Sequence, residues 1–191
     1  EEYKRASFLG RVFQDPMTGT SADMEIIENL ALAARRGQKR TLKWGVKKTE
    51  REHFIEQLKT LGLGLEDRLT AKVGLLSGGQ RQALTLLMST IKQPRILLLD
   101  EHTAALDPKT AAKVLEITDK IVNEQNLTTL MVTHNMQQAL DYGNRLLMMD
   151  AGEIVFDLAE KEKEGLSMND IIEKFQKIKN KSFTTDRVLL Q

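Results

Sequence analysis

The sequence predicts an α/β fold, in which a parallel-sheet core, incomplete in these residues, carries an inserted α-helical subdomain. Two short apolar runs, 95–99 and 129–133, have the unbroken hydrophobic character of strands that are buried on both faces of a parallel sheet. A helix predicted from about Pro108 to Glu124 joins them, which gives a strand, helix, strand unit. A third apolar segment, Ser7 to Phe13, ends at the turn signal Gln14-Asp15-Pro16 and predicts another buried strand.

The other segments predict helices and one strand pair. Apolar residues recur every three or four positions in 22–34 and 49–61, and 75–93 predicts a turn and a long helix that Pro94 ends. Arg145 to Asp157 predicts two short strands around an Asp-Ala-Gly turn. We therefore expect one domain over 1–191, divided into a core strand and loop at 1–14, the helical subdomain at 15–93, the rest of the core at 94–157 and a charged, mostly helical tail at 158–191.

Composition excludes several classes of protein. Lys and Arg total 28 against 27 for Asp and Glu, so net charge gives no reason to expect nucleic acid as a partner. The absence of cysteine excludes disulfides, thiolate metal sites and cysteine nucleophiles. No apolar stretch approaches the roughly 20 residues that span a bilayer, so the sequence predicts no membrane-spanning segment of its own.

A basic run extends from Arg35 to Arg51 and contains eight basic residues and a single acid, Glu50. Such a run is typical of a solvated loop or helix face, within which Trp44 would be a local packing anchor. Contact with phospholipid headgroups or another partner is the alternative. The sequence leaves the role of this run open.

The segment Leu76-Ser77-Gly78-Gly79-Gln80-Arg81-Gln82, here called the signature segment, stands directly before a predicted helix. A helix N-terminus offers unpaired amides and a positive dipole end, and two glycines let a phosphate approach them closely. Ser77 adds a hydroxyl donor. The alternative is structural, because Ser77 and Gln80 also have the spacing of a capping box.

Asp100 and Glu101 follow the apolar run 95–99, at the end of a strand where ligands bind in open α/β sheets. In nucleotide hydrolases an acid at this place holds Mg²⁺ and a neighbouring group orients the attacking water. Asp100 suits the metal and Glu101 suits the water. The alternative is that the two acids only mark where the strand reaches the surface.

Three further residues are candidates that carry little weight alone. Asp107 precedes Pro108 and has the position of an N-cap with proline at the first helical residue. His134 follows the strand at 129–133, where a donor could reach the same pocket, although a lone histidine before a helix is more often a cap or a packing residue. Gln14 ends the first predicted strand.

Taken in order, these motifs resemble the ATP-binding-cassette (ABC) ATPase family across essentially the whole chain. The resemblance implies a P-loop NTPase-like core with ATP and Mg²⁺ as cofactors. It also implies roles for the candidate residues. Gln14 resembles the Q-loop glutamine that senses metal and γ-phosphate, and Ser77, Gly78, Gly79 and Gln80 resemble the signature that contacts ATP held by an opposing subunit. Asp100 would be the Walker B metal ligand, Glu101 the catalytic base, Asp107 the D-loop aspartate at the dimer interface, and His134 the switch histidine.

The sequence departs from the family pattern at His102, where the family usually has proline, and we expect only a small local effect there.

The phosphate-binding P-loop motif G-x-x-x-x-G-K-[ST] is not found in the sequence, since none of the 12 glycines is followed by lysine. The chain begins with Glu1 rather than Met, which we interpret as truncation. The expectation is that the complete protein hydrolyses ATP, whereas this chain by itself binds nucleotide poorly and does not turn it over.

The resemblance implies a transporter subunit that couples ATP hydrolysis in a head-to-tail dimer to solute transport, with import of small polar solutes such as amino acids favoured. The expected partners are transmembrane permease subunits, a second ATPase subunit and a substrate-binding protein, at the cytoplasmic face of the cell membrane. One alternative is a soluble ABC ATPase of translation or DNA repair, which would carry a second cassette or a long coiled-coil insertion. The other is a degenerate, non-catalytic ABC module.

Overall fold

The computed structural model describes residues 2–38 and 45–174. The chain divides into two compact units, Glu1–Val132 and Thr133–Gln191. None of the described helices combines the length and the apolar character that crossing a membrane requires.

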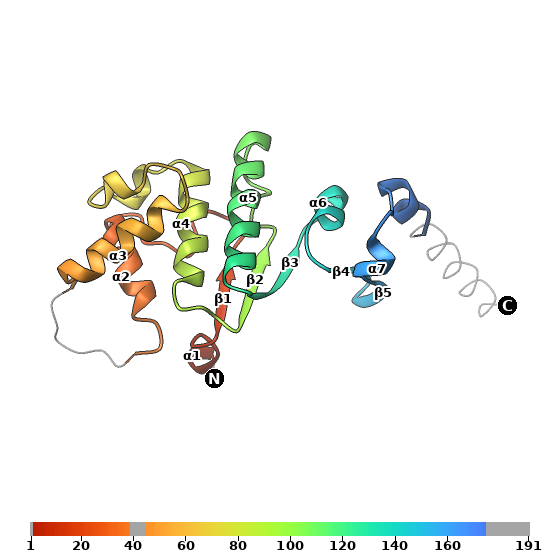
Figure 1. The fold of residues 1–191 in the computed structure, drawn as a ribbon, viewed down its shortest axis with the longest axis horizontal. Helices are drawn as coiled ribbons and strands as arrows, with labels where there is room; N and C mark the ends of the chain where they lie inside the picture. Colours follow the sequence, from red (N-terminus) through yellow and green to blue (C-terminus); the bar gives the residue numbers. More distant parts are fainter. Residues whose placement is uncertain (1, 39–44, 175–191) are drawn as a thin grey trace. The chain divides into compact units, whose positions relative to one another are not determined.

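The core of the first unit is a parallel sheet of three strands in the order β1-β2-β3 (Figure 1). Val12 of β1 pairs with Leu99 of β2, and Asp100 of β2 pairs with Val132 of β3. A helix, α5, connects β2 to β3, so the predicted strand, helix, strand unit and the α/β fold are confirmed. The bounds of these elements are β1 Leu9–Val12, β2 Ile96–Asp100, α5 Pro108–Glu124 and β3 Thr128–Val132.

Two of the strands differ from the prediction. The short helix α1 (Glu2–Arg5) and a turn, in which the Phe8 amide donates to the Arg5 carbonyl at 3.1 Å, occupy the residues before Leu9 and shorten β1. β3 was predicted to be buried on both faces. Leu130 and Val132 are instead 53% and 50% exposed, because β3 lies at the edge of the sheet that the described residues form.

Helices and 3₁₀ turns fill the chain between β1 and β2: α2 (Ile26–Ala34), α3 (Lys48–Lys59), two turns (Glu66–Arg68 and Val73–Leu75) and α4 (Gly78–Thr90). α2 begins four residues later than predicted, because the Glu28 carboxylate accepts a hydrogen bond from the Glu25 amide at 2.8 Å and caps the helix there. In the basic run, Arg35 pairs with Glu50 at 3.1 Å, whereas Trp44 and the rest of 39–44 lie outside the described residues.

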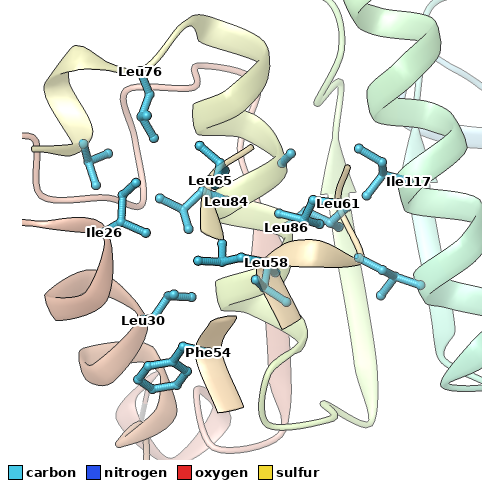
Figure 2. Packing of buried hydrophobic residues seen from close by; sticks show 14 of the residues in the cluster. Ile26, Leu30, Phe54, Leu58, Leu61, Leu65, Leu76, Leu84, Leu86 and Ile117 are labelled. Carbon is cyan, nitrogen blue, oxygen red and sulfur yellow. The ribbon is translucent and has the colours of Figure 1, made fainter. Parts of the chain in front are cut away.

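Helix α4 lies in the middle of the first unit, beside the strands on one side and α2 and α3 on the other (Figure 1). It is buried along most of its length, and Figure 2 shows its Leu84 and Leu86 among the apolar side chains of the neighbouring elements. Leu97 and Leu99 of β2 are 0% and 1% exposed and belong to the same cluster. This core therefore fixes the position of α4 against the ends of β1 and β2.

The second unit contains a strand pair and short helices: α6 (Met136–Asp141), β4 (Arg145–Asp150), β5 (Glu153–Ala159) and α7 (Glu160–Lys163). β4 and β5 are antiparallel around a turn at Ala151 and Gly152, which confirms the predicted pair. The tail was predicted to begin at Leu158. That boundary is wrong, because Leu158 pairs with Leu146 and packs against Ile171, which keeps β5 extended to Ala159. Residues 175–191 of the predicted tail lie outside the described residues.

Candidate functional site at the strand ends

The ends of β1 and β2 bring two predicted site residues together. Gln14 and Glu101 each stand two residues beyond the paired residues Val12 and Leu99, so parallel pairing places them side by side. The Gln14 side-chain amide (Nε2) donates a hydrogen bond to Glu101 Oε2 at 3.2 Å. This amide therefore orients the carboxylate that the sequence identified as the water-orienting group.

Asp100 lies next to this pair and is engaged by a cation. The Arg11 guanidinium is 3.0 Å from Asp100 Oδ2, and the two side chains are 53% and 47% exposed. The same guanidinium lies 4.5 Å from the centre of the Phe13 ring. Arg11 was not among the predicted site residues, and the signal for it was a charged residue inside an otherwise apolar strand.

The backbone at Glu101 has an unusual conformation. Its φ is 43°, in the left-handed region that residues with a side chain adopt at a cost of about 1–3 kcal/mol. The Glu101 amide donates to the Val132 carbonyl at 3.0 Å, and the Ala104 amide donates to the Glu101 carbonyl at 2.9 Å. These bonds hold the residue in a strained conformation that turns the chain sharply after β2.

The signature segment begins α4, with Ser77 as the N-cap. Ser77 Oγ accepts from the Gln80 amide at 3.3 Å, and Gln80 Oε1 accepts from the Ser77 amide at 3.2 Å. The capping box that the sequence left as an alternative is thus present. It does not exclude the phosphate-binding role, since Ser77 and Gln80 remain at the exposed start of the helix.

The two glycines of the signature segment pack against the start of α5. A Cβ added at Gly78 would lie 3.3 Å from Leu106 Cδ2, and one added at Gly79 would overlap Thr110 Cγ2. Asp107 is the N-cap of α5: its carboxylate accepts from the Thr110 amide at 3.1 Å, and hydrogen bonding to Thr110 lowers the Asp107 pKa. The predicted signature and D-loop residues are therefore neighbours within this chain.

Two buried residues behind the strand ends were not predicted to matter. Gln82 is fully buried, and its Nε2 donates to the Phe13 carbonyl at 2.9 Å and to the His102 carbonyl at 2.6 Å. Arg81, 3% exposed, donates to Thr20 Oγ1 at 2.7 Å and to the Met17 carbonyl at 3.3 Å. Both stand in or beside the quoted motif, but a glutamine or an arginine near a helix start gives no signal of burial.

His102 is also interior, at 1% exposure. Its Nε2 lies 3.1 Å from Thr118 Oγ1, and that hydroxyl donates to the Val114 carbonyl at 2.8 Å. Because Thr118 uses its proton on Val114, His102 Nε2 carries the hydrogen and Nδ1 is the unprotonated nitrogen. Burial lowers the His102 pKa to about 4, so the ring is neutral near pH 7.

His134 belongs to the second unit, where it is exposed and stands directly before Asn135, the N-cap of α6. The Asn135 side chain accepts from the Gln138 amide at 3.1 Å, so Asn135, and not His134, caps this helix. The capping alternative for His134 is therefore wrong, and its role as a switch residue stays a prediction.

The donor groups at the strand ends fit Mg²⁺. The carboxylates of Asp100 and Glu101 and the amide of Gln14 offer the hard oxygen ligands that this cation prefers. No group of three or more histidine, cysteine or acidic side chains gathers within the described parts of the chain. Mg²⁺ commonly uses one or two carboxylates and takes its other ligands from phosphate and water, so a small set is sufficient.

Comparison with known proteins agrees with this geometry. Residues 3–104, which include Gln14, the signature segment, Asp100 and Glu101, match the ABC transporter family. The chain is 52% identical over 177 residues to a tyrosine transport ATP-binding protein of Clostridioides difficile, covering 92% of this chain and 69% of that protein. It is 45% identical over 111 residues to a methionine import ATP-binding protein, MetN 2, of Enterococcus faecalis, covering 58% of this chain and 32% of that protein.

Solved structures give the same result for the fold. One is the ATP-binding cassette MJ0796 in a dimeric, post-hydrolysis state bound to ADP and Pi. Its sequence is 28% identical to this chain, the TM-score is 0.66, and the match covers 83% of this chain and 66% of the MJ0796 chain. Another is CbiO1 of Clostridium perfringens, part of an ABC transporter complex, which is 23% identical with a TM-score of 0.69. The match covers 88% of this chain and 62% of the CbiO1 chain, and at this identity it supports the fold alone. By its sequence, its motifs and its fold, the chain belongs to the ABC transporter family.

Proposed function

We propose that this chain is part of the ATP-binding and ATP-hydrolysing subunit of an ABC membrane transporter. The observation that carries the proposal is the Gln14 to Glu101 hydrogen bond of 3.2 Å beside Asp100, at the ends of adjacent parallel strands. Phosphoryl transfer needs an oriented nucleophile and neutralised charge more than covalent chemistry; these three groups would orient the attacking water and hold the Mg²⁺ that neutralises charge on the phosphates. The chain spans 69% of the tyrosine transport relative, so activity is proposed for the complete protein.

Each residue has a distinct task in this proposal. Asp100, helped by Gln14, holds Mg²⁺, which when bound neutralises charge on the phosphates. Glu101 accepts a proton from the attacking water, and the Gln14 amide keeps its carboxylate turned toward that water. His134, which follows β3 in the chain, is proposed as the switch histidine of the complete subunit.

The signature segment acts on nucleotide held by a second subunit. Ser77, Gly78, Gly79 and Gln80 form the start of α4, where Ser77 and Gly78 are exposed, and the positive end of the helix dipole there favours the γ-phosphate. Asp107 stands beside this segment through the contact of Gly79 with Thr110 and serves the dimer interface. The cassette MJ0796 is described as a dimer bound to ADP and Pi, which supports a paired arrangement with ATP as cofactor.

The transport role is import at the cytoplasmic face of the membrane. The names of the relatives support it, since one is a tyrosine transport protein and others are methionine import proteins. An amino acid is the proposed class of solute. The proposed partners are permease subunits, a second ATPase subunit and a substrate-binding protein.

The deciding experiment is ATP hydrolysis by the complete gene product and by its Glu101→Gln variant. Removing the general base is expected to lower kcat at least about 100-fold while ATP binding, measured by equilibrium dialysis, is retained. Glu124→Gln, at the exposed end of α5, is the matched control and keeps wild-type kcat.

Two other outcomes would contradict the proposal. A complete protein that binds ATP but hydrolyses none, with Glu101→Gln indistinguishable from it, would favour the degenerate module. Hydrolysis that survives Glu101→Gln unchanged would show that the base is another residue.

A further inference from the structure

Gln82 makes contacts that link three parts of the candidate site. It lies in the second turn of α4, five residues after Ser77, or about 7.5 Å along the helix. Its side-chain nitrogen has two hydrogens, and both are used: one on the Phe13 carbonyl at 2.9 Å and one on the His102 carbonyl at 2.6 Å. Phe13 directly precedes Gln14, and His102 directly follows Glu101.

These two carbonyls control the residues next to them. The Phe13 carbonyl lies in the same rigid peptide plane as the Gln14 amide, so fixing that oxygen fixes the start of Gln14. The His102 carbonyl is anchored one residue beyond Glu101, whose φ of 43° is a conformation that its surroundings must hold. One side chain thus positions both members of the Gln14 to Glu101 hydrogen bond from the buried side.

The orientation of the Gln82 amide is determined by its acceptors. Two carbonyl oxygens require Nε2 to face them, and Oε1 is left buried without a hydrogen-bond partner among the described residues. The side chain therefore satisfies two backbone carbonyls at the strand ends, which would otherwise lose their hydrogen bonds in the interior.

Arg81 reinforces the same connection. Its guanidinium donates to Thr20 Oγ1 and to the Met17 carbonyl, which lie in the segment that follows Gln14. Consecutive residues of α4 therefore hold the chain on both sides of Gln14. A displacement of the Ser77 end of α4 would move these anchors with the helix, because α4 is continuous from Gly78 to Thr90.

We propose that Gln82 is a positioning residue that couples the signature end of α4 to the geometry of the Gln14 and Glu101 pair. The proposal rests on the proposed function for its kinetic consequence, but its structural consequence does not need ATP. A nucleotide that engages Ser77 would shift α4, and the two hydrogen bonds of Gln82 would pass that shift to the water-orienting carboxylate.

The test compares Gln82→Met, which keeps the volume and removes both donors, with Thr85→Val on the same helix. Thr85 is equally buried, and its hydroxyl donates only to the Arg81 carbonyl, at 2.9 Å, so Thr85→Val removes a buried hydrogen bond without touching the strand ends. Hydrogen exchange is measured on the complete gene product without nucleotide, in peptides covering 11–16 and 99–105.

Gln82→Met is expected to raise the rate of hydrogen exchange about tenfold in both peptides, which corresponds to the net free energy of one lost hydrogen bond. Thr85→Val is expected to leave the exchange rates of both peptides within about twofold of wild type. Equal exchange in the two variants, or no change in Gln82→Met, overturns the proposal. Should Gln82→Met fail to fold, Gln82→Asn replaces it. The shorter amide reaches at most one carbonyl, so unchanged exchange in both peptides again overturns the proposal.

ATP kinetics of the same variants give the second readout. Gln82→Met is expected to lower kcat about tenfold and to change the KM for ATP by less than about twofold, with Thr85→Val close to wild type, because positioning acts on the reacting carboxylate and not on nucleotide affinity. A rise in KM with unchanged kcat overturns the coupling. A wild-type protein that hydrolyses no ATP refutes the proposed function, and the exchange experiment then decides the positioning role alone.

Discussion

The buried side and the solvent side of the strand ends are built from different interactions. On the buried side, neutral groups of Gln82 and His102 make hydrogen bonds to backbone carbonyls and a hydroxyl, with almost no exposure to water. On the solvent side, Arg11 pairs with Asp100 while both remain about half exposed. The difference indicates a division of tasks: the buried contacts hold the backbone in place, and the exposed carboxylates stay accessible to a ligand.

The first prediction tests the buried side through His102 and has the largest expected effect. Because burial lowers its pKa from 6.5 to about 4, the unfolded chain takes up a proton before the folded chain does as pH falls. The stability from the neutral ring is fully present above pH 6.5 and is lost on the way to pH 4, which amounts to about 3 kcal/mol. His102→Gln is expected to lack this part of the pH dependence in urea unfolding.

His53, an exposed histidine of α3, provides the control. His53→Gln should retain the full wild-type slope between pH 6.5 and pH 4. A wild-type slope in His102→Gln would show that other groups cause the acid sensitivity.

The second prediction concerns Gly79, where α4 meets α5. Gly79→Ala brings a methyl group against Thr110 Cγ2 and is expected to lower the free energy of unfolding by about 1–3 kcal/mol, as overpacking in a core does. Thr110→Ser removes that methyl group. The double variant Gly79→Ala with Thr110→Ser should therefore recover most of the loss in thermal unfolding, and additive losses would contradict the contact.

The third prediction has the smallest effect and concerns the solvent side. Arg11→Ala is expected to cost less than about 1 kcal/mol of folding stability, because both partners of its ion pair are well exposed. The loss should become smaller still in 1 M salt, where screening extends over only about 3 Å. A loss as large as that expected for Gly79→Ala would mean that the exposed pair also holds the fold, and the division between the two sides would then fail.

The sequence predicted the elements of the core well because their signals are local. The apolar run at 95–99, the proline at 108 and the three-and-four spacing at 49–61 each depend on a few neighbouring residues, and β2, α5 and α3 were all found there. Boundaries were predicted less well. The Glu28 carboxylate caps α2 at Glu25, three residues earlier, a local signal that the apolar periodicity does not contain. Leu158 packs on Leu146 of the neighbouring strand, and this more distant contact extends β5.

For the candidate site, sequence reasoning identified exposed polar residues at strand and helix ends and missed the residues behind them. Gln14 and Glu101 were identified by position, and parallel pairing then explains why they meet. Gln82 could not be found this way, because its partners are backbone carbonyls 69 and 20 residues away, which no side-chain pattern reveals. His102 was expected to matter little, yet it is buried and bonded to Thr118.

The left-handed backbone conformation of Glu101 affects which residues are favoured at this position in related sequences. Glycine and asparagine adopt this conformation at lower cost than glutamate, so a chain released from the need for a carboxylate would gain stability by exchanging it. Drift alone would then favour those two residues at this position. Glutamate at this position lowers folding stability relative to glycine or asparagine, so its presence indicates that selection still acts on the carboxylate.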